Sequence, residues 1–103
     1  MGEPRKSETV IQDCIKAHAL GVLILSTHAQ EQMKVRDIDL SDIEEALYQA
    51  QREDDKDQLT DDKKEWKYAI RGMNNNGDKD IRIIVKYLAS QKMLVITAID
   101  KNK

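Results

Sequence analysis

The chain has 103 residues, of which 40% are hydrophobic and 35% are charged, and this balance favours one small globular domain over a disordered chain. No apolar run approaches the ~18 residues of a membrane span, and the opening MGEPRKSETV lacks the apolar core of a signal peptide. The net charge of −2 conceals an asymmetry, because residues 1–65 hold 16 acids against 9 Lys and Arg, whereas residues 66–103 hold 3 against 8. Such a division is typical of a protein whose basic half binds a polyanion. It can also be an accident of a small, highly charged protein.

The first predicted helix runs from about Ser7, its cap, to Ala19, with Gly21 as the stop signal. Cys14 lies on the apolar stripe of this helix, so we interpret it as a buried structural thiol rather than a nucleophile. One cysteine cannot form an internal disulfide, and a reducing cytoplasm is therefore the expected compartment. His18 ends the stripe, where we expect an ordinary half-buried histidine. The apolar residues of this stripe recur at helical spacing: Val10, Ile11, Cys14 and Ile15.

Two further helices are predicted after a short apolar strand at residues 22–26. THAQEQMKVRDI predicts a helix capped by Thr27, with Gln30 three residues later in the capping-box arrangement. DIDLSDIEEALYQAQ predicts a third helix, with Ser41 and Glu44 as another capping box. Both helices have apolar stripes that can cover a sheet.

The chain is predicted to be one domain, residues 1–103, in which residues 1–6 are disordered. Residues 51–65, QREDDKDQLTDDKKE, hold almost no apolar side chains, and we expect a mobile acidic loop there. An acidic run is usually a solvated surface. It can also shield a basic site, although nothing in the sequence requires this.

Three strands are predicted next, at residues 66–72, 80–88 and 92–100. Turns at Asn74–Gly77 and Ala89–Lys92 would pair them antiparallel. Because side chains alternate faces along a strand, both turns then select the same apolar face. The predicted fold is α+β, with N-terminal helices packed on one face of an antiparallel three- to four-stranded meander. The predicted apolar face comprises Trp66, Tyr68, Ile70, Ile81, Ile83, Val85, Tyr87, Leu94, Ile96 and Ala98.

The opposite face of this sheet is predicted to be cationic. It would carry Lys67, Arg71, Arg82 and Lys86 within ~10 Å of each other. It lacks Glu and has only Asp80 near its edge, which favours an anion site over a merely solubilising surface. The side chains interspersed among the cations are mostly apolar and indicate partial cover by a partner, a loop or the chain's own terminus: Ile84, Val95, Thr97 and Ile99.

Several familiar active sites are excluded. Gly72 and Gly77 are isolated, so there is no Gly-rich phosphate loop. His18 and His28 lack metal-ligand spacing with Cys14, and neither a Ser-His-Asp elbow nor a DNA-specific motif is present. We therefore expect no metal and no cofactor. A cationic sheet face can still support a metal-free ribonuclease, which needs a base for the ribose 2′-OH, cations for the transition state and an acid for the leaving oxygen.

The segment THAQEQMKVRDIDLSDIEEAL resembles the His-x-x-x-Arg-Met signature of a family of small uncharacterised prokaryotic domains, and the resemblance extends over residues 10–103. His28, Met33 and Arg36 fit the signature, as does Ile38. Gln32 stands where an arginine is usual, which puts in doubt any site that uses that arginine.

The order of elements also resembles the MqsR and RelE/ParE-like toxin superfamily. The resemblance implies a RelE-like fold, metal-independent cleavage of free or ribosome-bound mRNA, and neutralisation by an antitoxin protein. Lys101 falls on a lysine that the resemblance implies is catalytic. Lys67 falls where those toxins have a functional glutamine, and Arg82 where they have a functional tyrosine.

The leading hypothesis is a toxin-like endoribonuclease with Lys67, Arg82, Lys101 and His28 as catalytic residues. Its predicted substrate contacts are Arg71, Lys86 and Arg36. The alternative is a non-catalytic RNA- or protein-binding module that retains the toxin-like fold, and a structural or regulatory protein without a polyanion ligand is a third. A structural role also remains open for the two signature residues, with the histidine bridging helix and sheet and the arginine pairing with the acidic loop.

Overall fold

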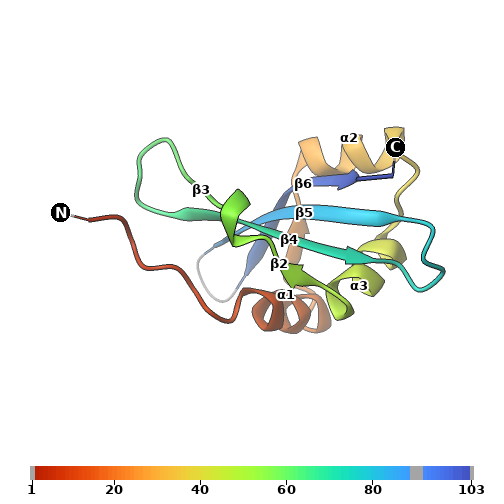
Figure 1. The fold of residues 1–103 in the computed structure, drawn as a ribbon, viewed down its shortest axis with the longest axis horizontal. Helices are drawn as coiled ribbons and strands as arrows, with labels where there is room; N and C mark the ends of the chain where they lie inside the picture. Colours follow the sequence, from red (N-terminus) through yellow and green to blue (C-terminus); the bar gives the residue numbers. More distant parts are fainter. Residues whose placement is uncertain (1, 89–91, 103) are drawn as a thin grey trace.

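The computed structural model describes residues 2–88 and 92–102, over which the chain forms three α-helices and a six-stranded sheet (Figure 1). This architecture confirms the α+β class. The helices are α1 (Val10–Ala19), α2 (Thr27–Val35) and α3 (Leu40–Tyr48). The strands are β1 (Leu23–Leu25), β2 (Gln51–Arg52), β3 (Gln58–Leu59), β4 (Trp66–Met73), β5 (Asp80–Tyr87) and β6 (Met93–Asp100), and a 3₁₀ turn, η1 (Asp54–Lys56), separates β2 from β3.

The sheet is larger than predicted and mixed. Its order is β1-β6-β5-β4-β2, and β3 also pairs with β4. β4, β5 and β6 pair antiparallel, whereas β1 pairs parallel to β6. The prediction of a three- to four-stranded antiparallel meander therefore describes only the centre of this sheet, and the RelE-like fold stays a prediction.

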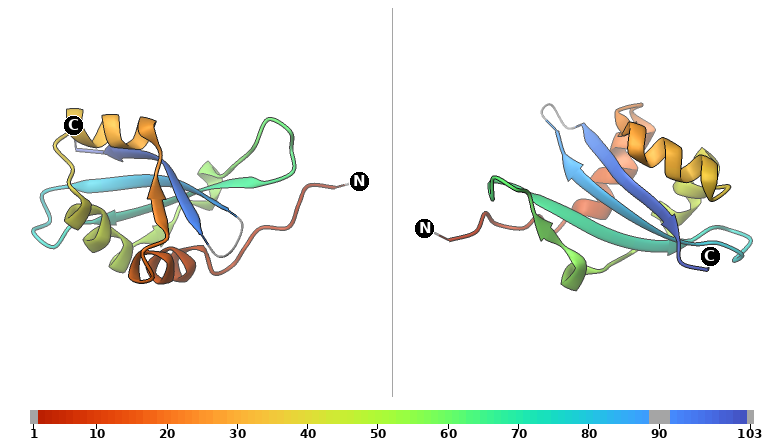
Figure 2. Two further views of the ribbon diagram at one scale, coloured as in Figure 1. Left: turned by 180° about the vertical axis from the view of Figure 1, so that it is seen from behind. Right: turned by 90° about the horizontal axis from the view of Figure 1, so that it is seen from above.

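The helices lie on one face of the sheet, which we call the inner face (Figure 2). α3 packs closely on β4 because Gly72 has no side chain, and a Cβ atom there would lie 2.1 Å from the carbonyl oxygen of Ala46. α2 runs along the part of β6 that no strand covers. The Ala98 N–H donates to Gln32 Oε1 at 3.1 Å, and the Ser26 hydroxyl donates to the Ile96 carbonyl at 3.0 Å. These bonds satisfy an otherwise open sheet edge.

The core forms between the helices and the inner face, and its fully buried members are aliphatic or sulfur-containing side chains apart from Tyr68. Cys14 is fully buried in it, and this burial raises the pKa of the thiol to about 12. The prediction of a structural thiol is thus confirmed. No helix in the described part of the chain is long and apolar enough to cross a membrane.

The caps of α2 and α3 lie one or two residues before the predicted ones, whereas the N-cap position of α1, Thr9, lies two residues after the predicted Ser7. Ser26, rather than Thr27, accepts the capping hydrogen bond of α2. Asp39, rather than Ser41, caps α3 in a capping box with Asp42. α1 begins without a side-chain cap.

The first hairpin is two residues longer than the predicted turn. The Asn74 N–H donates to the Lys79 carbonyl at 3.2 Å, so the loop closes on residues 74–79. Tyr68 consequently pairs with Val85 instead of Ile83. The shift is an even number of residues, so every side chain keeps its predicted face.

In the second hairpin, three residues of β6 face the side opposite to the predicted one: Leu94, Val95 and Ile96. Residues 84 and 97 are paired, as are residues 85 and 95, so β6 carries one extra residue, a β-bulge. Met93 and Val95 therefore point into the core, whereas Leu94 and Ile96, predicted on the apolar face, do not. The predicted turn at Ala89–Lys92 falls largely on residues 89–91, which lie outside the described residues.

Two further segments lie against the sheet. Residues 51–65, the acidic segment, fold against β4 as β2, η1 and β3. Residues 2–9, the arm, run along one end of the inner face, where the Trp66 Nε1–H donates to the Pro4 carbonyl at 2.7 Å. Both segments thus contact the sheet directly.

Candidate functional site

The face of the sheet opposite the helices, the outer face, gathers the cations that the alternation pattern predicts there. Lys67 and Arg71 come from β4, and Arg82 and Lys86 from β5. Arg71 lies directly opposite Arg82 in the sheet. Like charges in directly opposed positions destabilise a sheet unless they are compensated. The outer face therefore needs counter-ions.

A groove of about 320 Å³, the outer groove, is hollowed into this face. Lys67 and Arg82 project into it from β4 and β5, and Lys56 approaches from η1. The rest of its lining combines Gln58 and Thr97 with the apolar side chains of Ile84, Ile96 and Ile99. The structure thus brings two predicted catalytic residues, Lys67 and Arg82, into one groove.

Lys67 is half-buried in the outer groove and has no counter-ion. Within residues 2–88 and 92–102, no carboxylate or hydrogen-bond acceptor is paired with its ammonium group. Partial burial removes water from the charge, and no protein group replaces that water. An anionic ligand at Lys67 would supply the missing interaction.

Arg82, in contrast, is neutralised by Glu53, which follows β2. Arg82 donates to the Glu53 carboxylate through Nε at 2.7 Å and Nη2 at 3.1 Å, and Arg71 Nη1 lies 3.7 Å from the same carboxylate. The hydrogen bond from Arg82 holds the pKa of Glu53 below its usual range. Glu53 in turn raises the pKa of Arg82. One carboxylate thus lies between two guanidinium groups, a position that also suits a phosphate.

Arg71 has a second partner, Asp80, at the start of β5. It donates to this carboxylate through Nε at 2.8 Å and Nη2 at 2.5 Å, and this bidentate pair lowers the pKa of Asp80. Lys101 makes a smaller electrostatic contribution to the same shift. Lys101 is exposed beyond the end of β6, where its backbone N–H donates to the Asp80 carbonyl at 2.6 Å. Lys101 does not line the outer groove.

Lys86 forms the remaining ion pair of the outer face. Its ammonium group lies 3.0 Å from Glu65, whose side chain is half exposed. Exposed pairs of this kind contribute only ~0–1 kcal/mol to stability. A stronger anion could therefore displace Glu65 at low cost.

His28 and Arg36 lie on α2 and not at the outer groove. His28 is exposed near the start of the helix, and Arg36 is its half-buried C-terminal cap. Between them, Gln32 holds the edge of β6 through Ala98. The segment at residues 27–47 thus contacts the sheet edge through Gln32.

Sequence reasoning left open whether the acidic segment shields a basic site, and it did not identify the acids that compensate the cations on the two faces of the sheet. Glu53, Asp57 and Glu65 all come from the acidic segment, which looked like a solvated surface. Burial alone would raise the pKa of Asp57, but hydrogen bonds from Arg52 and the Ala69 N–H bring it below the ordinary value. The available signal was the charge complementarity between residues 51–65 and the cations of β4 and β5.

No group of three or more His, Cys, Asp or Glu side chains in the described residues could hold a metal ion. The chemistry that the outer groove offers is therefore that of ammonium and guanidinium groups beside an apolar surface. Such groups bind phosphates, carboxylates and the apolar faces of nucleobases.

Comparisons with known proteins locate the chain within one family. No curated protein and no solved structure matches it. The family model described as "Domain of unknown function (DUF4258)" matches residues 25–100, which include the signature segment, the acidic segment and strands β4 to β6. The chain therefore belongs to the DUF4258 family.

Proposed function

We propose that the outer groove binds single-stranded RNA. The observation that carries this proposal is the half-buried, uncompensated ammonium of Lys67 beside an apolar floor. Lys67 would bind a backbone phosphate, with Arg82 as the second donor. The isoleucine side chains of β5 and β6 would contact the nucleobase, whose flat face is apolar.

A single strand suits this groove better than a duplex. Unpaired bases can turn out of the backbone and reach a protein surface, whereas the bases of an RNA duplex are shielded in its deep, narrow groove. The chain also carries a net charge of −2, and three of the four outer-face cations have acidic partners. We therefore expect few phosphate contacts and modest affinity.

Cleavage of the bound RNA is the second candidate, favoured by the joint location of Lys67 and Arg82 in one groove. The 2′ oxygen would attack the phosphorus atom as solvent water takes the 2′-OH proton, and the Lys67 ammonium would stabilise the charge on the phosphorane-like transition state. The bond to the 5′ oxygen would break, and the Lys56 ammonium would protonate that leaving group. The products would be a 2′,3′-cyclic phosphate and a 5′-OH end. An antitoxin-like partner would then have to cover this groove.

Fluorescence anisotropy with a labelled 12-residue oligouridine, titrated from 20 to 150 mM salt, tests the binding proposal. Lys67→Ala should weaken binding about tenfold, because one charge-assisted phosphate contact is lost, and should reduce the salt slope by about 0.7. Lys16→Ala, which removes the same charge from exposed α1, is the matched control and should change little. Equal affinity of the two variants would refute the proposal.

The same RNA, recovered after incubation, tests cleavage by mass spectrometry. Accumulation of cyclic phosphate ends with the wild type, but not with Lys67→Ala, would support the ribonuclease. Intact RNA at saturating protein, with and without ribosomes, would leave the binding module as the function.

A further inference from the structure

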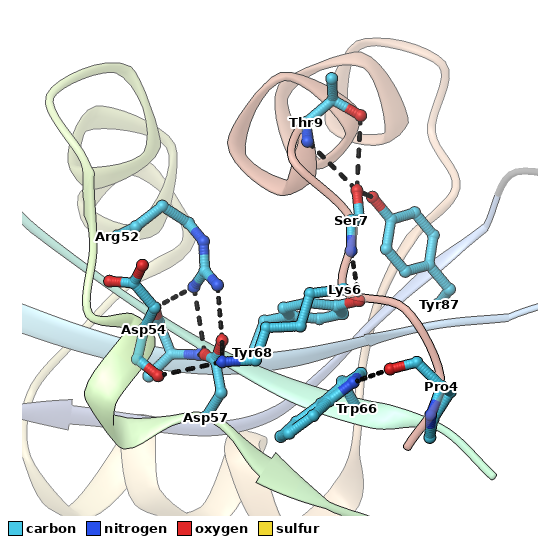
Figure 3. Close-up of polar contacts among 11 residues, drawn as sticks. Pro4, Lys6, Ser7, Thr9, Arg52, Asp54, Asp57, Trp66, Tyr68 and Tyr87 are labelled. Carbon is cyan, nitrogen blue, oxygen red and sulfur yellow. Dashed lines mark hydrogen bonds and ion pairs between the residues drawn. The ribbon is translucent and has the colours of Figure 1, made fainter. Parts of the chain in front are cut away.

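The arm binds the sheet as an extended peptide binds a receptor (Figure 3). The Trp66 Nε1–H donates to the Pro4 carbonyl at 2.7 Å, and the Ser7 N–H donates to the Tyr68 hydroxyl at 2.8 Å. The Ser7 hydroxyl is also hydrogen-bonded to the Tyr87 hydroxyl at 2.8 Å. Three aromatic side chains of β4 and β5 thus contact the arm through its backbone and one small hydroxyl.

Between these contacts, the Lys6 ammonium group occupies a site built from three different groups (Figure 3). It lies 3.2 Å from the Asp57 carboxylate and 3.3 Å from the Asp54 carbonyl oxygen. It also lies 4.5 Å from the centre of the Trp66 ring, in a cation–π contact. We call the site formed by Asp54, Asp57, Trp66, Tyr68 and Tyr87 the arm groove.

The arm groove does not need the arm for its charge balance. Asp57 is already held by Arg52, at 2.6 and 3.1 Å, and by the Ala69 N–H at 2.8 Å. Removal of Lys6 therefore leaves no unpaired buried carboxylate. Lys6 itself is 37% exposed, so its ion pair adds little stability. Asp57 thus stays satisfied without the arm, whose departure would cost the hydrogen bonds of Pro4 and Ser7 and one partly exposed ion pair.

We propose that the arm groove binds an extended, lysine-containing segment of a partner protein, and that residues 4–7 occupy it as an internal ligand. The contacts define the segment: a backbone carbonyl, an ammonium group two residues later, and, at the residue after that, a backbone N–H and a small hydroxyl. Pro4 favours the extended conformation before binding. The groove lies within residues 54–87, inside the family match, whereas the arm lies outside it.

The internal ligand sets how strongly a partner must bind. A tethered segment competes at an effective concentration on the order of millimolar. A partner segment with the same contacts would therefore bind weakly while the arm is seated. A longer segment, or a loosened arm, would shift the balance towards the partner.

A fluorescein-labelled peptide of residues 2–9 tests this inference in the full-length protein. We expect it to bind the Lys6→Ala protein about fivefold more tightly than the wild type, because the tethered competitor loses its ion-pair and cation–π contacts. A peptide carrying Lys6→Gln should bind about fivefold more weakly than the native peptide, since it loses the cation–π and ion-pair contacts. Near-UV circular dichroism establishes that the variant is folded.

A second measurement works on the wild type alone and avoids any folding defect. The Ser7 amide resonance of the ¹⁵N-labelled wild type should move towards its position in a released arm when the unlabelled native peptide is added in excess, and should move less at the same concentration of the Lys6→Gln peptide. Equal binding of the two peptides, or no binding of either to the folded Lys6→Ala protein, would overturn the inference. RNA binding at the outer groove is independent of both results.

Discussion

The outer groove and the arm groove use alternate residues of the same strand, since Lys67 faces the first while Trp66 and Tyr68 face the second. At the outer groove the strands provide cations and the acidic segment provides the anions. At the arm groove the acidic segment provides the anion, and a distant part of the chain provides the cation. The acidic segment therefore compensates charge on both faces, through Glu53 on one and Asp57 on the other.

The two grooves differ in whether a charged side chain remains without a partner. At the outer groove one cation, Lys67, remains without a counter-ion among the described residues. At the arm groove Asp57 is balanced before Lys6 arrives. The first site thus favours a new anion, whereas the second exchanges one cationic segment for another.

The largest effect is expected for Gly72→Ala, which should damage both regions together. The added Cβ atom would meet the backbone of Ala46, which no side-chain rotation can relieve. We expect a loss of about 3 kcal/mol in the free energy of unfolding, measured by urea denaturation. Met73→Ala, at the exposed neighbouring position, is the control. Wild-type stability of Gly72→Ala would contradict the packing of α3 on β4.

Asp57→Asn should follow, because Asp57 holds β4, Arg52 and the arm at once. We expect a loss of about 2 kcal/mol, since charge-assisted hydrogen bonds become neutral ones. The lowered pKa gives a pH signature. The stabilisation is fully present above the unfolded pKa of about 3.9 and is lost as pH falls through the lower folded value. Urea denaturation between pH 2 and 6 should therefore show a shallower acid slope in Asp57→Asn, and an unchanged slope would contradict this role.

Glu53→Gln should change binding at the outer groove without changing binding at the arm groove. It frees Arg82, whereas Arg71 keeps Asp80, so oligouridine should bind several-fold more tightly, with a stability loss of about 1 kcal/mol. The peptide affinity of the arm groove should not change. Glu44→Gln makes the same charge change on α3 and serves as the control. If both variants gained equally, net charge and not the displacement of Glu53 would govern binding.

Lys6→Ala should have the smallest effect on stability. An exposed ion pair and one cation–π contact together contribute about 1 kcal/mol or less. Release of the arm should shift Trp66 fluorescence to longer wavelength while leaving RNA affinity unchanged. A stability loss comparable to that of Asp57→Asn would mean that the arm is an integral part of the core.

Local patterns predicted the helices and the central strands, but not the register of the second hairpin. Met93, Leu94, Val95 and Ile96 are all apolar, so alternation could not distinguish the two faces of β6. Only the bulge at Ile96, a tertiary feature, decides which of them reach the core. The first hairpin kept its faces because its error was an even number of residues.

The candidate site was predictable where it depends on strand alternation. Lys67 and Arg82 share the outer groove because both occupy outward positions on neighbouring strands. Their counter-ions were not predictable, because Glu53 reaches them only after β2 and η1 fold back onto β4. His28 and Lys101 were included through resemblance, and sequence spacing could not show that neither lines the groove.

The most direct test of the central claim is an NMR titration of the ¹⁵N-labelled protein with oligouridine. We predict that the shifted amide resonances cluster around Lys67, Arg82, Ile84 and Ile99, with saturable changes that weaken as salt is raised. Shifts confined to the helices, or none at millimolar RNA, would contradict the claim that the outer groove binds RNA.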